Sequence, residues 1–299
     1  MAEVLYKANN VCKKYGSKSV LQDVNITINK GDIYGLVGKN GAGKTTLMRI
    51  MTGLQDPSSG KIDYGFNRKK LGAVGALVEL PSIYANMSAY ENLKLQYINI
   101  GRPVDDSINE ILSMVGLDNT GKLSAGKFSL GMRQRMGIAM AMAGNPEILI
   151  LDEPINGLDP QGIIGVRDLL LKLNKEKGIT IVISSHILSE LSKLATRFAF
   201  IDKGRIVREA SAEEIEQAGQ KRLEVFTSNP VELSNYLVTH GFDARVDRIT
   251  NHVLVFGDIS IVDLAVSCKE STFEVSDIRH VDTDLEKFFV ELVGGTTHA

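Results

Sequence analysis

The feature that most constrains this chain is a glycine-rich segment, GKNGAGKT at residues 38–45, which fits the pattern GxxxxGK followed by Ser or Thr. An apolar run, IYGLV at 33–37, precedes it, and TLMRIM at 46–51 follows with the composition of a helix. Glycines let the backbone curl so that its N–H groups face phosphate oxygens, and the start of a helix adds partial positive charge. The order strand, loop, helix therefore predicts a phosphate-binding loop for a nucleoside triphosphate rather than a chance turn.

Two side chains of this loop have separate expected roles. The Lys44 ammonium is placed to reach the β- and γ-phosphates, and the Thr45 hydroxyl can bind Mg²⁺. The residues that we expect to bind the nucleotide in and beside the loop are Gly38, Asn40, Gly41, Ala42, Gly43, Lys44, Thr45 and Thr46.

The composition excludes several classes of protein. With 299 residues, of which 43% are hydrophobic, the chain can build a large domain and a small one. A net charge of −2 gives no basic surface, so we expect no nucleic-acid partner. The two cysteines match no metal-binding spacing and are expected to be reduced thiols of a cytosolic protein. No signal peptide is visible, and no apolar run approaches the roughly 18–20 residues that span a bilayer, so a pore would have to be on another chain.

The spacing of apolar residues divides the first two thirds of the chain. Residues 3–30 alternate between apolar and polar, which predicts antiparallel strands, whereas 88–143 show helical spacing. Two continuous apolar runs at 147–151 and 179–183 predict buried parallel strands, with a crossover helix at 161–177. This order predicts an α/β domain with a mainly parallel sheet.

A second pattern follows a polar, helix-prone connector at 212–220. We expect strands at 223–227, 244–249, 253–256 and 273–278, and helices at 231–240, 261–268 and 285–292. These elements predict a small α+β domain at 221–299, which contains no motif that we can tie to chemistry.

An apolar strand, ILIL at 148–151, ends in two carboxylates. Asp152 lies where it can hold Mg²⁺ through water, and Glu153 can polarise an attacking water as a general base. A polar strand end without catalytic function gives the same letters, but the upstream phosphate loop favours the catalytic interpretation.

Two further segments contain candidate phosphate contacts. Ser129 is a plausible N-cap of a helix, and Gly131 beside it leaves room for an anion, although capping alone explains both residues. His186 follows the strand at 179–183, at the end where parallel sheets bind their ligands, but a lone histidine is more often structural.

These motifs, taken in order, resemble those of the nucleotide-binding subunits of ATP-binding cassette (ABC) transporters. The resemblance implies that Tyr15 stacks on adenine and that Asp159 belongs to the D-loop. It also implies that Ser129 and Gly131 contact the γ-phosphate of an ATP held by a partner subunit, and that His186 contacts the γ-phosphate as well. Lys44, Glu153 and His186 are then the implied catalytic residues.

Two positions depart from the usual pattern of this family. The signature segment reads FSLGM at 128–132, where LSGGQ is usual, and Glu79 stands where most relatives have the Q-loop glutamine. The resemblance implies that Glu79 contacts Mg²⁺ and ATP, with an added negative charge there; the alternative is an exposed glutamate without function. These departures, with the small C-terminal domain, resemble the exporters of antimicrobial peptides, the lantibiotic-immunity and bacitracin-resistance transporters.

The resemblance also implies an architecture, cofactors and partners. We expect a P-loop NTPase cassette at 1–215, with an antiparallel β subdomain and a helical subdomain at about 80–143, followed by the accessory domain at 221–299. The implied cofactors are ATP and Mg²⁺, the metal being held by Thr45, Asp152 and Glu79. The implied partners are a second cassette, identical or homologous, and an integral membrane permease at the cytoplasmic face of the membrane.

Two other classes of protein share part of this pattern. A GTPase-type switch would use DPQG at 159–162 as its D-x-x-G motif, but NKEK at 174–177 is not N-K-x-D. A soluble ABC-type ATPase acting on DNA or ribosomes usually has two cassettes or a coiled-coil insertion, and this chain shows one cassette and no heptads. Co-purification with membranes or with ribosomes would separate these classes.

Overall fold

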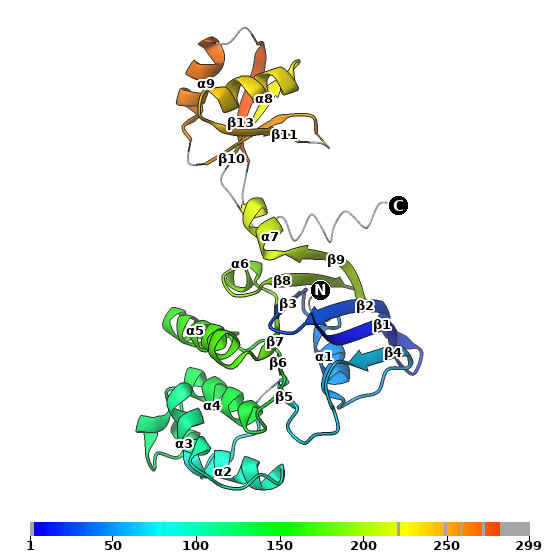
Figure 1. Cartoon of the computed structure of the whole chain (residues 1–299), viewed down its shortest axis with the longest axis vertical. Helices are drawn as coiled ribbons and strands as arrows, with labels where there is room; N and C mark the ends of the chain where they lie inside the picture. The colour runs from blue at the N-terminus through cyan, green and yellow to red at the C-terminus, as the bar shows by residue number, and fades with distance from the viewer. Residues whose placement is uncertain are drawn as a thin grey trace. The chain divides into compact units, whose positions relative to one another are not determined.

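The computed structural model of the chain describes residues 3–79, 81–219, 222–247, 250–257, 259–270 and 273–281. Contacts within the chain divide it into two compact units, with the boundary between Ala212 and Glu213 (Figure 1). Among the described residues, no helix combines the length and the apolar character that a membrane span requires.

The first unit is built on a six-stranded sheet with the order β5-β6-β7-β3-β8-β9, in which only β9 runs antiparallel to its neighbour. Every residue of β3, β6 and β7 is buried, as the continuous apolar runs predicted. The predicted α/β domain with a mainly parallel sheet is therefore confirmed. The strands are β3 (Ile33–Val37), β5 (Val74–Leu77), β6 (Ile148–Leu151), β7 (Thr180–Ser185), β8 (Arg197–Asp202) and β9 (Arg205–Ser211).

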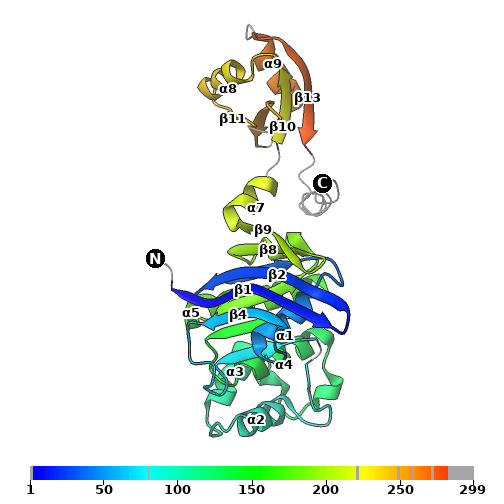
Figure 2. The same cartoon turned by 90° about the vertical axis from the view of Figure 1, so that its right-hand side faces the viewer.

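A second, antiparallel sheet has the order β2-β1-β4 and is seen face-on in Figure 2. It consists of β1 (Val4–Tyr15), β2 (Lys18–Asn29) and β4 (Ser59–Tyr64). Its apolar face shares one core with α1 (Lys44–Thr52) and with the parallel sheet, through side chains such as Leu21, Leu47 and Ile150. The alternating pattern at 3–30 correctly predicted the β1–β2 pair, whereas β4, β5, β8 and β9 were not predicted.

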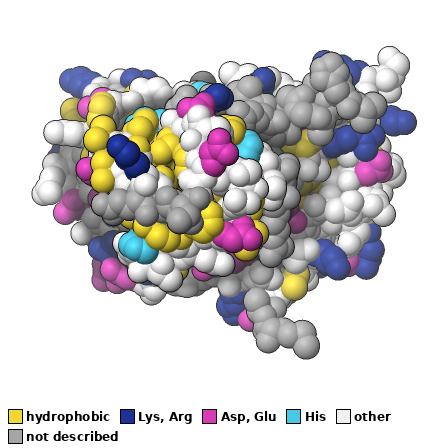
Figure 3. Space-filling model, turned by 90° about the horizontal axis from the view of Figure 1, so that it is seen from above, with side chains coloured by type: hydrophobic (Ala, Val, Ile, Leu, Met, Phe, Trp, Pro, Cys, Tyr) yellow, Lys and Arg dark blue, Asp and Glu magenta, His cyan; other side chains and the backbone are white. Residues whose placement is uncertain are grey.

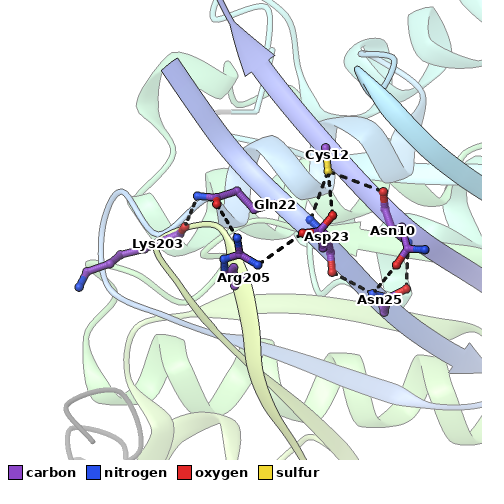
Figure 4. A network of polar contacts seen from close by, with 7 residues as sticks. All are labelled: Asn10, Cys12, Gln22, Asp23, Asn25, Lys203 and Arg205. Atoms are coloured by element: carbon purple, nitrogen blue, oxygen red, sulfur yellow. Dashed lines mark hydrogen bonds and ion pairs between the residues drawn. The ribbon is translucent and has the colours of Figure 1, made fainter. Parts of the chain in front are cut away.

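A polar network on the β1–β2 pair joins this sheet to the β8–β9 turn (Figure 4). The pairing of β1 with β2 shifts register around Cys12, where the Asp23 N–H donates to Cys12 Sγ at 3.3 Å. Arg205 pairs with Asp23 at 3.4 Å and donates to Gln22 Oε1 at 2.7 Å, which ties β9 to β2. Cys12 and Cys268, the two cysteines of the chain, are not joined by a disulfide.

The segment between β5 and β6 is mainly helical, as the periodicity at 88–143 predicted. α2 begins with a capping box, because Ser88 accepts a hydrogen bond from the Glu91 N–H while the Glu91 carboxylate accepts one from the Ser88 N–H. The helices of the first unit, besides α1, are α2 (Ala89–Asn99), α3 (Ser107–Met114), α4 (Leu130–Met142), the crossover helix α5 (Pro160–Lys177) and α6 (Leu188–Leu191).

The second unit has the β-α-β-β-α-β order of a ferredoxin-like fold, and its antiparallel sheet has the strand order β11-β12-β10-β13. Its core joins sheet residues such as Leu223 and Val255 to Leu233 and Leu264 on the two helices. The elements are α7 (Ala212–Gly219), β10 (Arg222–Thr227), α8 (Pro230–Thr239), β11 (Asp243–Val246), β12 (Val253–Phe256), α9 (Ile261–Glu270) and β13 (Val275–Val281).

Most of the predicted elements of this unit are confirmed, with shifts at their ends. The last predicted strand begins at Val275 rather than at 273, and the helix predicted at 285–292 lies outside the described residues. Figure 3 shows hydrophobic side chains in patches that are interrupted by basic, acidic and histidine side chains. The large apolar side chains exposed on α8 and α9 are Val231, Val238, Val262 and Val266.

Candidate nucleotide-binding site

The candidate site lies where three neighbouring strands of the parallel sheet end. The strand order β6-β7-β3 brings the carboxyl ends of these strands to one edge, which is where sheets of this kind bind ligands. The phosphate loop follows β3, Asp152 and Glu153 follow β6, and His186 follows β7. Segments far apart in the sequence therefore contribute to one site.

The phosphate loop is packed on one side and open on the other. A Cβ on Gly38 would lie 2.6 Å from the Ile201 carbonyl oxygen, and one on Gly43 would lie 2.9 Å from Leu21 Cδ2. Gly43 is also the N-cap of α1, with a φ of 111° that favours glycine. In contrast, a Cβ on Gly41 would meet no atom within 4 Å. The glycines thus let the loop sit tightly on β2 and β8 while its other side stays accessible to a ligand.

Lys44 lies across this loop, with only 5% of the residue exposed. Its ammonium donates hydrogen bonds to the carbonyl oxygens of Gly38 at 2.6 Å and Lys39 at 3.3 Å. It also forms an ion pair with Glu153 Oε1 at 3.2 Å. A nearly buried cation at the start of α1 creates the positive field that a phosphate group requires.

Both oxygens of the Asp152 carboxylate are held by hydroxyl groups. Thr45 Oγ1 donates to Asp152 Oδ2 at 2.7 Å, and Ser184 Oγ donates to Asp152 Oδ1 at 2.5 Å. Ser184 is fully buried near the end of β7, and the sequence analysis did not identify it. The available signal was the pair of serines, Ser184 and Ser185, that ends this strand after its apolar residues.

Glu153 is bound by Ser184 and His186, which lie at and just after the end of β7, and by Lys44 of α1. Its N–H donates to Ser184 Oγ at 2.9 Å, and its Oε2 accepts a hydrogen bond from His186 Nδ1 at 2.9 Å. Its Oε1 is buried and faces Lys44 as an ion pair, without hydrogen-bond geometry. Because a carboxylate can only accept, the proton of the imidazole lies on Nδ1, which leaves Nε2 available for another partner.

These residues fit a metal-bound triphosphate. Hydroxyl and carboxylate oxygens, as on Thr45 and Asp152, are the ligands that Mg²⁺ prefers. The Lys44 ammonium and the N–H groups of a glycine-rich loop are suited to phosphate oxygens. The buried Glu153 Oε1, which has no hydrogen-bond donor among the described residues, can accept a proton from a water molecule.

Ser129, Gly131 and Asp159 meet in a separate hollow of about 540 Å³, whose lining includes neither Lys44 nor Asp152. Ser129 caps α4 by accepting a hydrogen bond from the Met132 N–H at 3.2 Å, which confirms the predicted N-cap. Asp159 caps α5 in the same way, with the Gly162 N–H at 3.0 Å. The N-termini of two helices therefore face one hollow, an arrangement that attracts an anion.

Two predicted site residues make other contacts. The Tyr15 hydroxyl donates to Gln55 Oε1, and Lys13 Nζ lies 5.3 Å from the centre of the Tyr15 ring. Glu79 accepts a hydrogen bond from the Arg49 guanidinium of α1. Arg49 was not among the predicted site residues, although its position one helical turn after Thr45 places it on the same face of α1. The roles of Tyr15 and Glu79 at the nucleotide stay predictions.

Comparison with known proteins identifies relatives over most of the chain. Residues 21–156 match the ABC transporter family. The bacitracin transport ATP-binding protein BcrA of Bacillus licheniformis is 40% identical over 98% of each chain. The lantibiotic transport ATP-binding protein SrtF of Streptococcus pyogenes is 42% identical over 76% of this chain and 97% of its own. Among solved structures, a dimeric post-hydrolysis state of the ATP-binding cassette MJ0796 bound to ADP and Pi matches with a TM-score of 0.62 and 26% identity, over 70% of this chain and 99% of that one.

Proposed function

The chain belongs to the ATP-binding proteins of ABC transporters and is an ATPase, and on this basis we propose that it drives the export of an antimicrobial peptide, such as bacitracin or a lantibiotic, through a separate membrane-spanning subunit. The choice of cargo rests on the similarity to BcrA, which extends along almost the whole of both chains. The subunit would work at the cytoplasmic face of the membrane, bound to its permease.

The chemistry that we propose uses the cluster around Glu153. The N–H groups of residues 38–46 and the Lys44 ammonium bind and orient the triphosphate of ATP. Thr45, Asp152 and Glu79 would hold Mg²⁺, which would neutralise phosphate charge. Glu153 accepts the proton of the attacking water, while His186 Nδ1 holds the Glu153 carboxylate in place, with the 2.9 Å hydrogen bond supporting this role. His186 Nε2 then faces the γ-phosphate.

We assign the hollow of Ser129, Gly131 and Asp159 to a second cassette, identical or homologous. In one chain this hollow is separate from the lining of the phosphate loop, so each half needs its complement from another copy. The dimeric structure of the MJ0796 cassette supports a pair of cassettes, which we place head to tail. ATP would then lie between Lys44 of one cassette and Ser129 of the other.

We assign a groove between β5 and the helices α2 and α4 to the permease. Adjoining hollows of about 390 and 450 Å³ are lined by apolar side chains such as Met140 and by amides such as Gln96, with no charged residue among the lining. A surface of this kind suits a short, uncharged helical segment of a membrane protein, because no buried charge has to be compensated.

The experiment that tests this function compares Glu153→Gln with Glu147→Gln, an exposed glutamate just before β6. Each variant is expressed with the cognate permease in a sensitive host, and the inhibitory concentrations of bacitracin and of a lantibiotic are measured. ATP hydrolysis and oligomeric state are measured on the purified protein.

We expect Glu153→Gln to reduce turnover by about 10²–10⁴-fold, to trap an ATP-dependent dimer and to abolish resistance. Glu147→Gln should behave as the unmodified protein in all three measurements. Resistance that survives Glu153→Gln, or co-purification with ribosomes instead of membranes, would overturn the proposal and favour an ABC-type ATPase with a non-transport partner.

A further inference from the structure

Arg49 and Glu79 form an ion pair beside the candidate metal site. Arg49 follows Thr45 by one helical turn on α1, so both side chains project from the same face of this helix. Thr45 binds Asp152, and Arg49 binds Glu79. The first contact connects α1 to the end of β6, and the second connects it to the segment just after β5.

The backbone brings Glu79 close to Asp152. The Asp152 N–H donates to the carbonyl oxygen of Leu77 at 2.7 Å, at the point where β5 ends beside β6. Glu79 comes two residues later and has a φ of 67°, in the left-handed region that non-glycine residues seldom adopt. The carboxylates of Glu79 and Asp152 therefore belong to the same edge of the sheet.

The two carboxylates at this edge of the sheet have hydrogen-bond donors of different charge. Thr45 gives Asp152 a neutral hydroxyl donor, whereas Arg49 gives Glu79 a full positive charge. A divalent cation is attracted by both carboxylates and repelled by the guanidinium. With side-chain exposures of 31% for Arg49 and 61% for Glu79, the pair is accessible to water and can open at little cost.

We propose that Arg49 is a positioning residue that competes with the divalent metal for the Glu79 carboxylate. Arg49 holds Glu79 when no metal–nucleotide complex is bound, and Glu79 changes partner when the complex binds. This inference rests on the proposed function, in which Glu79 contacts the metal. Because Glu79 stands at the start of the segment that leads into α2, the exchange of partners connects the nucleotide site to the groove assigned to the permease.

The test measures how strongly Mg²⁺ tightens the binding of a fluorescent ATP analogue to the full chain. The readout is the ratio of the Kd in EDTA to the Kd in saturating Mg²⁺, in a Glu153→Gln background so that turnover does not contribute. Arg49→Gln should raise this ratio by roughly three- to tenfold, because the competing charge is gone. Glu79→Gln should lower it, and adding Arg49→Gln to Glu79→Gln should change it by less than about twofold.

Two controls accompany these variants. Arg279→Gln removes another exposed arginine that pairs with an aspartate, in the second unit of the chain, and should leave the ratio unchanged. Arg49→Lys keeps the charge and should stay close to the unmodified protein, which also provides a folded variant if Arg49→Gln is unstable.

The outcomes test the metal contact of Glu79 separately from the competition by Arg49. A ratio that does not respond to Glu79→Gln refutes the metal contact of Glu79 in the proposed function. A ratio that responds to Glu79→Gln but stays constant or falls in Arg49→Gln refutes the competition by Arg49 and leaves the metal contact intact.

Discussion

The two regions of the cassette to which we assign phosphate binding are built in different ways. Around Lys44, the side chains are buried and bind one another, so that Asp152 and Glu153 have fixed partners within the chain. Around Ser129, the Ser129 and Asp159 side chains cap helices, and a Cβ on Gly131 would meet only Leu158 Cδ2, at 3.9 Å. The first region is preorganised by contacts within the chain, whereas the second has exposed helix N-termini that can bind an anion held by another molecule. From this difference we expect hydrolysis to depend on both regions and folding to depend mainly on the first.

The largest expected effect comes from Lys44→Ala. This change removes the phosphate ligand and leaves Glu153 Oε1 buried without its counter-charge. We expect turnover at saturating ATP to fall by about 10²–10³-fold and nucleotide binding to weaken. The measurement is steady-state hydrolysis together with equilibrium binding, with Lys30→Ala, an exposed lysine paired with Glu3, as the control. Normal turnover in Lys44→Ala would mean that the preorganised region is not the catalytic one.

A second change acts on the open region alone. Ser129→Asp keeps a side chain that caps α4, so the free energy of unfolding should change by less than about 0.5 kcal/mol. The added negative charge should repel the phosphate of the partner's ATP and reduce hydrolysis at least roughly tenfold. Binding of ATP to the monomer should persist. Urea unfolding, nucleotide binding and hydrolysis check the three statements, and a loss of monomer binding would contradict the separation of the two regions.

The smallest expected effect comes from Ser184→Ala, in the buried region around Lys44. Ser184→Ala removes the hydroxyl that donates to Asp152 Oδ1 and accepts from the Glu153 N–H. Because Ser184 is fully buried, both groups lose a partner that water does not readily replace, at a cost of about 1–3 kcal/mol in the free energy of unfolding. Denaturant unfolding measures this cost, and Thr45→Ser, which retains a hydroxyl, should lose less. Equal stability of Ser184→Ala and the unmodified protein would show that the network does not hold the cluster together.

Much of the site was predictable because its motifs depend on local geometry. The phosphate loop requires glycines and the start of a helix in sequence, and the buried strands β3, β6 and β7 are visible as apolar runs. The short strand β5 was missed, since its four residues contain a glycine and are too few to show a period. Without β5, the pattern of residues did not place Glu79 beside Asp152, and only the resemblance to the transporter family implied it.

The sequence by itself determined the class of fold, the phosphate loop and the residues that end the strands, because each of these depends on residue types at fixed spacing. Only the tertiary structure decided which side chains meet. The order β6-β7-β3 brings Ser184 and His186 beside Asp152 and Glu153, and the packing of α1 on the sheet pairs Arg49 with Glu79. Contacts of this kind join residues that are distant in the chain, and they depend on how strands are ordered and helices are packed, which no local pattern specifies.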